Sequence, residues 1–259
     1  MRGTVWDEER LTDPHGQPDK AARVRAMFDA IAPTYERVNH VLSLGSDARW
    51  RRRSVVLART NLADRVLDVA CGTGDFARAF AQASPLLVVG CDFAEQMLRR
   101  AAGSGTGLTE AGSAPIAPSS CCGIRWCRAD AMSLPFADQS FTLVSCAFGV
   151  RNFQDLAGGL REFHRVLSPG GRAVILEFSV PRSRLLGGLY QAYFKHVLPR
   201  LATWLSRDQS GAYHYLPKSV SSFVDSAGMT RNLRAAGFER IECQGQTIGI
   251  VRTFIAWKP

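Results

Sequence analysis

The sequence predicts a doubly wound α/β fold with a mostly parallel, seven-stranded sheet, because short apolar strand patterns alternate with helical patterns from residue 65 onward. A chain of 259 residues is long enough for one such domain with additions. Its composition of 46% hydrophobic and 21% charged residues is typical of a folded protein. We therefore expect a single domain over residues 21–259, preceded by a disordered tail over residues 1–20.

Helical patterns occupy residues 21–60. Apolar side chains recur there at spacings of three and four residues, and Pro33 breaks the first run. A second helical run starts near Tyr35. These helices precede the first strand, so we expect them to pack against the domain as an N-terminal addition.

Seven strand patterns follow, at residues 65–70, 86–92, 124–128, 141–147, 172–178, 239–244 and 252–257. Helical patterns separate them at 75–83, 94–102 and 156–167, and another helix ends at Gly237. Residues 103–123 are rich in Gly, Ser, Ala and Pro and predict a flexible loop. Residues 181–217 are aromatic and amphipathic and predict a helical cap insertion.

The net charge of +9 favours acidic partners such as nucleic acid, an anionic membrane surface or phosphorylated ligands. The densest basic cluster, 49–53, either forms a solvated helix face or docks on lipid headgroups or RNA, and the solvated face is favoured. The N-terminus lacks the apolar stretch of a signal peptide, and no segment reaches the roughly 20 apolar residues that span a bilayer. We expect a cytoplasmic protein, peripheral to the membrane at most. Its seven cysteines lack paired C-x-x-C spacing, so no metal site is expected.

The turn Gly72-Thr73-Gly74 lies between a buried strand and a helix, where backbone N–H groups and the helix dipole bind carboxylates or phosphates. With Ala77 it also fits a dinucleotide fingerprint, so a dehydrogenase is an alternative. A dinucleotide, like any other cofactor that contains a nucleoside, offers ribose hydroxyls to an acid that ends the second strand. Asp92 occupies that position.

Three further features separate these alternatives. Asp68 stands four residues before the first glycine, Asp130 and Ala131 follow the third strand, and 134–141 leads into the fourth. This ordered set resembles the class I S-adenosylmethionine-dependent methyltransferases, which are Rossmann-like. The resemblance implies S-adenosylmethionine as cofactor, an acid facing its methionine end and a pair of residues beside adenine. The cofactor-binding positions it implies are Asp68, Gly72, Thr73, Gly74, Asp92, Asp130, Ala131 and Ala147.

A narrower resemblance rests on the segments 147–152, 176–181 and 196–200, and on Tyr35-x-x-x-Asn39 with the following 43–50. From about Met27 to the C-terminus the chain is similar to the ubiquinone/menaquinone biosynthesis C-methyltransferase family. The resemblance implies C-methylation of a polyprenylated hydroquinone and favours demethylmenaquinol as acceptor. The benzoquinol intermediate of ubiquinone biosynthesis is the alternative. Ala147 stands where this family often has Ser, which removes one hydrogen bond to the cofactor.

The chemistry requires the reduced ring, because only a hydroquinone that loses a phenolic proton is a carbon nucleophile. Arg151 is expected to stabilise the phenolate or to orient the water that takes the proton, with a surface ion pair as the alternative. Asn152 either binds a quinol oxygen or shapes a turn. His196 either contacts the substrate or makes a structural hydrogen bond, and Tyr35 is expected to close the pocket.

Two rival functions use the same cofactor domain. An RNA methyltransferase would suit the charge, but the Asn/Asp-Pro-Pro-aromatic motif of base-amino methyltransferases is absent after the fourth strand, where 148–152 stands instead. A non-catalytic protein that binds the cofactor or the quinol is the other rival. We therefore expect a quinol partner, transient contact with a membrane surface and no nucleic acid. The sequence leaves a homodimer open.

Overall fold

The computed structural model describes residues 5–103, 123–179 and 210–259, together with residues 200, 203 and 206. The predicted flexible loop at 103–123 lies outside the described residues except for its two ends. Most of the predicted cap insertion at 181–217 also lies outside them, and so does His196.

Within the described residues, the strands form one seven-stranded sheet in the order β3-β2-β1-β4-β5-β7-β6. Strands β1 to β5 run parallel, and β7 is antiparallel to both of its neighbours. The prediction of a mostly parallel, doubly wound sheet is confirmed. The strands are β1 (Arg65–Val69), β2 (Leu87–Asp92), β3 (Arg125–Arg128), β4 (Phe141–Ala147), β5 (Leu167–Phe178), β6 (Arg240–Gln246) and β7 (Val251–Trp257).

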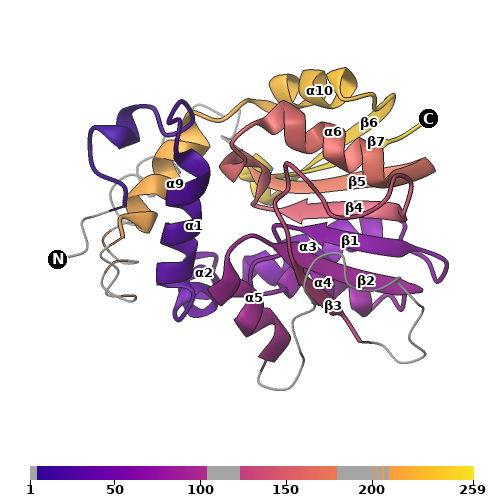
Figure 1. Ribbon diagram of the computed structural model, residues 1–259, viewed down its shortest axis with the longest axis horizontal. Helices are drawn as coiled ribbons and strands as arrows, with labels where there is room; N and C mark the ends of the chain where they lie inside the picture. The colour runs from indigo at the N-terminus through magenta and orange to yellow at the C-terminus, as the bar shows by residue number, and fades with distance from the viewer. Residues whose placement is uncertain (1–4, 104–122, 180–199, 201–202, 204–205, 207–209) are drawn as a thin grey trace.

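Helices cover both faces of the sheet because side chains of successive strand residues point to opposite faces. Val66 packs with α3 (Ser46–Leu57), α4 (Asp75–Ala81) and α5 (Glu95–Ala102), through apolar residues such as Phe76 and Leu98. Leu67 packs with α6 (Leu156–Val166) and α10 (Ser226–Ala235), through residues such as Phe163 and Leu233. Three layers result, with the sheet in the middle (Figure 1).

Strand β5 begins at Leu167, earlier than the predicted strand at 172–178. Phe141 pairs with Leu167 and Leu143 with Arg172, so the register shifts between these two pairs. Gly170 has φ +74°, which allows the chain to bulge there without a steric penalty.

The remaining helices gather at one end of the sheet. The helices α1 (Lys20–Ile31), α2 (Tyr35–Leu42) and α9 (Ala212–Ser221) lie together beyond the strands (Figure 1). They share an apolar cluster that includes Met27, Val38 and Tyr215. Short 3-10 turns complete the described elements: η1 (Arg10–Thr12), η3 (Val150–Asn152) and η5 (Thr247–Gly249). Among the described residues, no helix is long and apolar enough to cross a bilayer.

The prediction of a disordered tail at 1–20 is wrong for residues 5–20. Trp6 is only 2% exposed and stacks on Tyr215 at 4.4 Å between ring centroids. The Nε2 of His15 donates to the Ser219 carbonyl at 3.0 Å, and Lys20 Nζ donates to the Phe153 carbonyl at 2.6 Å. The polar composition of this segment concealed its anchors, which are a few apolar and basic side chains.

Replacing Trp6 tests whether this N-terminal arm contributes to folding. We expect Trp6→Ala to lower the free energy of unfolding by about 3–5 kcal/mol, because it removes a large buried ring. Leu62→Ala is the control, since Leu62 is 72% exposed and should change stability by less than about 0.5 kcal/mol. Urea denaturation measures both, and equal stability of the two variants would show that the arm does not pack.

Candidate active site

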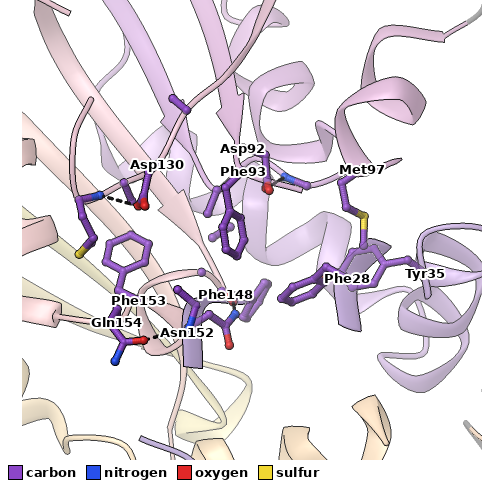
Figure 2. A pocket seen from close by; sticks show the side chains of 18 residues that line it. Phe28, Tyr35, Asp92, Phe93, Met97, Asp130, Phe148, Asn152, Phe153 and Gln154 are labelled. Atoms are coloured by element: carbon purple, nitrogen blue, oxygen red, sulfur yellow. Dashed lines mark hydrogen bonds between the residues drawn. The ribbon is translucent and has the colours of Figure 1, made fainter. Parts of the chain in front are cut away.

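A cavity lies at the carboxyl ends of the parallel strands, and its space of about 690 Å³ is partly open to solvent. Phe28 and Tyr35 reach into it from α1 and α2, opposite the ends of the strands (Figure 2). The predicted cofactor residues that line it are Gly72, Asp92, Asp130, Ala131 and Ala147. The carboxyl ends of four neighbouring strands, β1 to β4, therefore bring these separate motifs together.

Two acids line this cofactor cavity. Asp92 ends β2, and its carboxylate accepts hydrogen bonds from the Gly72 and Ala94 N–H groups, each at 2.8 Å. Burial raises the pKa of Asp92 to about 6. Asp130 follows β3 and accepts from the Met132 N–H at 2.9 Å. No Lys, Arg or His is among the described lining residues, so the cavity suits hydroxyls and a cationic ligand.

The glycine turn after β1 leaves open space beside the cavity. Gly72 has φ +56°, and a Cβ placed there would meet no atom within 4 Å. A ligand can therefore approach this backbone closely. Thr73 and Gly74 do not line the cavity. Thr73 is buried, and Gly74 is the N-cap of α4.

Asp68 is wholly buried inside β1 and does not line the cavity. Its Oδ1 accepts from the Ser145 hydroxyl at 2.7 Å, whereas its Oδ2 is buried without a hydrogen-bond partner among the described residues. Burial raises the pKa of Asp68 to about 7. A buried acceptor without a partner, an open glycine turn and two lining acids together fit the ribose and ammonium groups of S-adenosylmethionine.

A second, larger cavity adjoins the first. It encloses about 1680 Å³ of space that opens to solvent, and Phe28, Tyr35 and Phe148 line both cavities. Most of its other lining residues are apolar. It holds two buried charged residues, Arg51 and Arg151, and the second of these was predicted as a site residue from the sequence. The two cavities therefore meet at three aromatic rings, and we call the second one the acceptor cavity.

Phe148 adopts a strained backbone at this junction. Its φ is +57°, a conformation that bulky residues rarely adopt. Its N–H donates to the Leu176 carbonyl at 2.7 Å, and its ring lies 4.5 Å from that of Phe178. The next residue is Gly149. A Cβ at this position would lie 2.8 Å from the Cβ of Ala70, in the loop after β1, so the close approach of the two segments requires glycine. Strain held in place by such contacts is typical of functional sites.

Arg151 lies in η3, beyond the end of β4. Its Nη1 donates to the Phe148 carbonyl at 2.5 Å and to Glu177 Oε1 at 2.8 Å. Its Nε is buried and has no partner among the described residues. The alternative of a surface ion pair is wrong, because both partners are buried. Burial disfavours the charged guanidinium, but the Glu177 carboxylate, together with Tyr215 and Tyr35, raises the pKa of Arg151 overall.

Asn152 and Tyr35 also lie where the predicted site requires them. Asn152 lines the cofactor cavity, and its Oδ1 accepts from the Tyr215 hydroxyl at 3.0 Å. Burial raises the pKa of Tyr35, which packs edge-on against Phe28 at 5.9 Å. Both side chains are therefore held by other residues, which favours precise positioning of a ligand.

Sequence reasoning did not assign a role to three residues of this site. Phe28 belongs to the periodic apolar face of the first helix and is indistinguishable from core in the sequence. Phe148 and Glu177 stand inside the family-specific segments, which were the only signal available for them. The described residues contain no group of three or more His, Cys, Asp or Glu side chains that could hold a metal ion.

Solved structures share this fold at low sequence identity. A possible histamine N-methyltransferase from Thermotoga maritima has a TM-score of 0.59 and 17% identity, over 90% of this chain and 99% of its own. A putative methyltransferase from Haloferax volcanii, solved with the Trm112 activator, has a TM-score of 0.60 and 17% identity, over 90% of this chain and 97% of its own. These likenesses concern the fold alone.

Sequence relatives are much closer. A demethylmenaquinone methyltransferase from Deinococcus radiodurans is 44% identical over 93% of this chain and 94% of its own length. A ubiquinone/menaquinone biosynthesis C-methyltransferase from Geobacter sulfurreducens is 42% identical over 93% of this chain and 90% of its own length. The profile of the ubiE/COQ5 methyltransferase family matches residues 17–258. The chain therefore belongs to the ubiE/COQ5 methyltransferase family and is an S-adenosylmethionine-dependent methyltransferase.

Proposed function

We propose that this enzyme methylates a ring carbon of a polyprenylated hydroquinone, with demethylmenaquinol as the acceptor and menaquinol as the product. One observation carries the proposal: an acid-lined cofactor cavity meets a large, mostly apolar cavity that holds a buried guanidinium. The names of the Deinococcus and Geobacter relatives support the same reaction. The Geobacter name also includes ubiquinone biosynthesis, so the related benzoquinol is the second candidate acceptor.

The chain's own residues must make the acceptor ring nucleophilic. When bound, S-adenosylmethionine supplies an electrophilic methyl group. Arg151 holds its charge because Glu177 raises its pKa, so it stabilises a phenolate and does not act as the base. The phenolic proton passes to water. The ring carbon then bonds to the methyl group as the methyl–sulfur bond breaks, and it loses its own proton to water while the phenolate oxygen regains one, so one proton is released per methyl group transferred.

Aromatic side chains exclude water and set the orientation of the ring. Phe28, Tyr35 and Phe148 line both cavities, so they surround the point where acceptor and cofactor meet. Asn152 is fixed by Tyr215 and is placed to bind a ring oxygen. Alignment of this kind contributes up to about 7–11 kcal/mol in ideal cases.

Apolar side chains at the edge of the acceptor cavity support contact with a membrane surface. Val41 and Leu44 line this cavity although they are 46% and 91% exposed. Arg49, Arg52 and Arg53 are exposed on the adjoining helix α3. Exposed apolar residues beside basic ones suit transient docking on anionic lipids, where a prenyl tail would remain partly in the bilayer.

Turnover with reduced and oxidised acceptor tests the proposed function. We expect methylation of short-chain demethylmenaquinol and none of the corresponding quinone, because the oxidised ring is electrophilic. Anaerobic assays with isotopically labelled methyl donor, followed by NMR of the product, give both the rate and the site of methylation. Equal turnover of quinone without reductant, or methylation on oxygen, would refute the mechanism.

Arg151→Ala should lower kcat by about 10²–10³, in the range for losing one preorganised electrostatic group. It also leaves Glu177 buried without a partner, which costs about 3–5 kcal/mol of stability. The double variant Arg151→Met with Glu177→Gln separates these effects. We expect it to recover most of the stability but none of the lost kcat, with S-adenosylmethionine affinity unchanged throughout. Recovery of kcat together with stability would make the pair purely structural.

The raised pKa of Asp68 determines how the free energy of unfolding should depend on pH. Its pKa is about 7 in the fold and about 3.9 when unfolded, so between these values the folded state binds more protons. The free energy of unfolding should therefore fall as the pH rises through this window, by up to about 1.4 kcal/mol per pH unit. Denaturation of wild type and Asp68→Asn across this range measures the difference. Saturating S-adenosylmethionine should reduce the slope, because its ammonium favours ionised Asp68. Identical slopes in the two proteins would contradict the burial of this acid.

A further inference from the structure

A second guanidinium, that of Arg51 on α3, lines the acceptor cavity. Arg51 is only 8% exposed. Its Nη1 donates to Asp47 Oδ2 at 2.7 Å, and its Nη2 lies 3.8 Å from Asp75 Oδ2. The first contact is its only side-chain hydrogen bond to a described residue. A guanidinium carries five N–H donors, so most of the donors on Arg51 remain available to a ligand.

Arg51 and Arg151 lie against one pair of tilted rings that pack together. Phe148 and Phe178 pack at 4.5 Å between centroids. The Cζ of Arg51 lies 5.7 Å from the centroid of Phe148, and the Cζ of Arg151 lies 5.7 Å from the centroid of Phe178. Each cation therefore lies over a different ring of the pair. This geometry fixes both planar groups at the wall of the same cavity.

Both guanidinium groups also act on Tyr35, which lines the junction of the cavities. Burial raises the pKa of Tyr35, and the charges of Arg51 and then Arg151 lower it. The two cations therefore both lie close to the position where the acceptor ring meets the cofactor. Glu177 balances the charge of Arg151, whereas Asp47 and, at a longer distance, Asp75 balance that of Arg51.

A hydroquinone carries two oxygens on opposite edges of its ring. We propose that Arg51 is a second acceptor-binding residue, which donates to the ring oxygen opposite the one held by Arg151. The inference rests on the proposed methylation of a hydroquinone. It explains why the mostly apolar cavity contains two buried guanidinium groups with unused donors. It also makes the site selective, because an acceptor with one hydroxyl leaves buried donors of Arg51 without a partner.

The test compares two acceptors in each variant. One is short-chain demethylmenaquinol, and the other is the naphthol analogue that keeps only the hydroxyl beside the methylated carbon. We expect Arg51→Gln to lower kcat/KM for the hydroquinone by about 10- to 100-fold, mainly through KM, because a charge-assisted hydrogen bond is lost. With the naphthol, the same variant should change kcat/KM by less than about twofold. The two acceptors differ in intrinsic reactivity. This difference cancels, because the kcat/KM of the variant for each acceptor is compared with the kcat/KM of wild type for the same acceptor.

Two further variants control for folding. Arg25→Gln changes an exposed arginine of α1 that lines neither the cofactor cavity nor the acceptor cavity, and it should behave as wild type with both acceptors. Arg51→Lys keeps the charge beside Asp47 and should retain wild-type thermal stability. Lys lacks the planar fork, so it should restore selectivity only in part.

Three results would overturn the inference. Equal losses with both acceptors would make Arg51 structural. A loss of S-adenosylmethionine affinity in calorimetry, with acceptor KM unchanged, would assign Arg51 to the cofactor carboxylate, since Asp75 at the start of α4 is near it. If wild type methylates demethylmenaquinol and Arg51→Gln has unchanged kinetics, Arg51 does not bind the acceptor, and the proposed function is left intact. Failure of wild type with every prenylated hydroquinone would refute the proposed function itself.

Discussion

The position of β1 between β2 and β4 determines where the site forms. The connections of these two neighbours lie on opposite faces of the sheet. Helix α4, between β1 and β2, covers one face, and helix α6, which follows β4, covers the other. A crevice opens where the connections diverge, and ligands of open α/β sheets bind there. The turn at Gly72, the acid Asp92 and the loop that begins at Phe148 all follow strands at this crevice. Helices α1 and α2 then close it with Phe28 and Tyr35.

Charge burial is the second constraint. The acceptor cavity is mostly apolar, which suits a prenylated ring but penalises every ion in its walls. The fold pairs Arg151 with Glu177 on β5, and Arg51 with Asp47 one helical turn away. A buried ion pair of this kind contributes little net stability. Its value here is a fixed guanidinium beside the reacting ring, ready to stabilise a phenolate.

Local patterns were enough to predict the sheet and most of the cofactor site. Asp92 could be placed because it ends the second predicted strand, whereas the role of Asp130, which follows the third strand, was expected from the resemblance to class I methyltransferases. Tertiary contacts could not be predicted in the same way. Glu177 stands 26 residues from Arg151 in the chain, and nothing in the spacing indicates that they pair. Trp6 was missed because a single aromatic residue in a polar segment has no periodicity. The β5 bulge at Gly170 resembles an ordinary turn in the sequence.

The central claim is that this chain adds the ring methyl group of a prenylated quinone in the cell. Mass spectrometry of extracted quinones, with and without the gene, tests it most directly. The account predicts that cells without the protein accumulate demethylmenaquinone, lighter than menaquinone by one CH₂, and that wild-type protein restores menaquinone whereas Arg151→Ala does not. A normal quinone profile in cells that lack the protein and have no second methyltransferase of this family would contradict it.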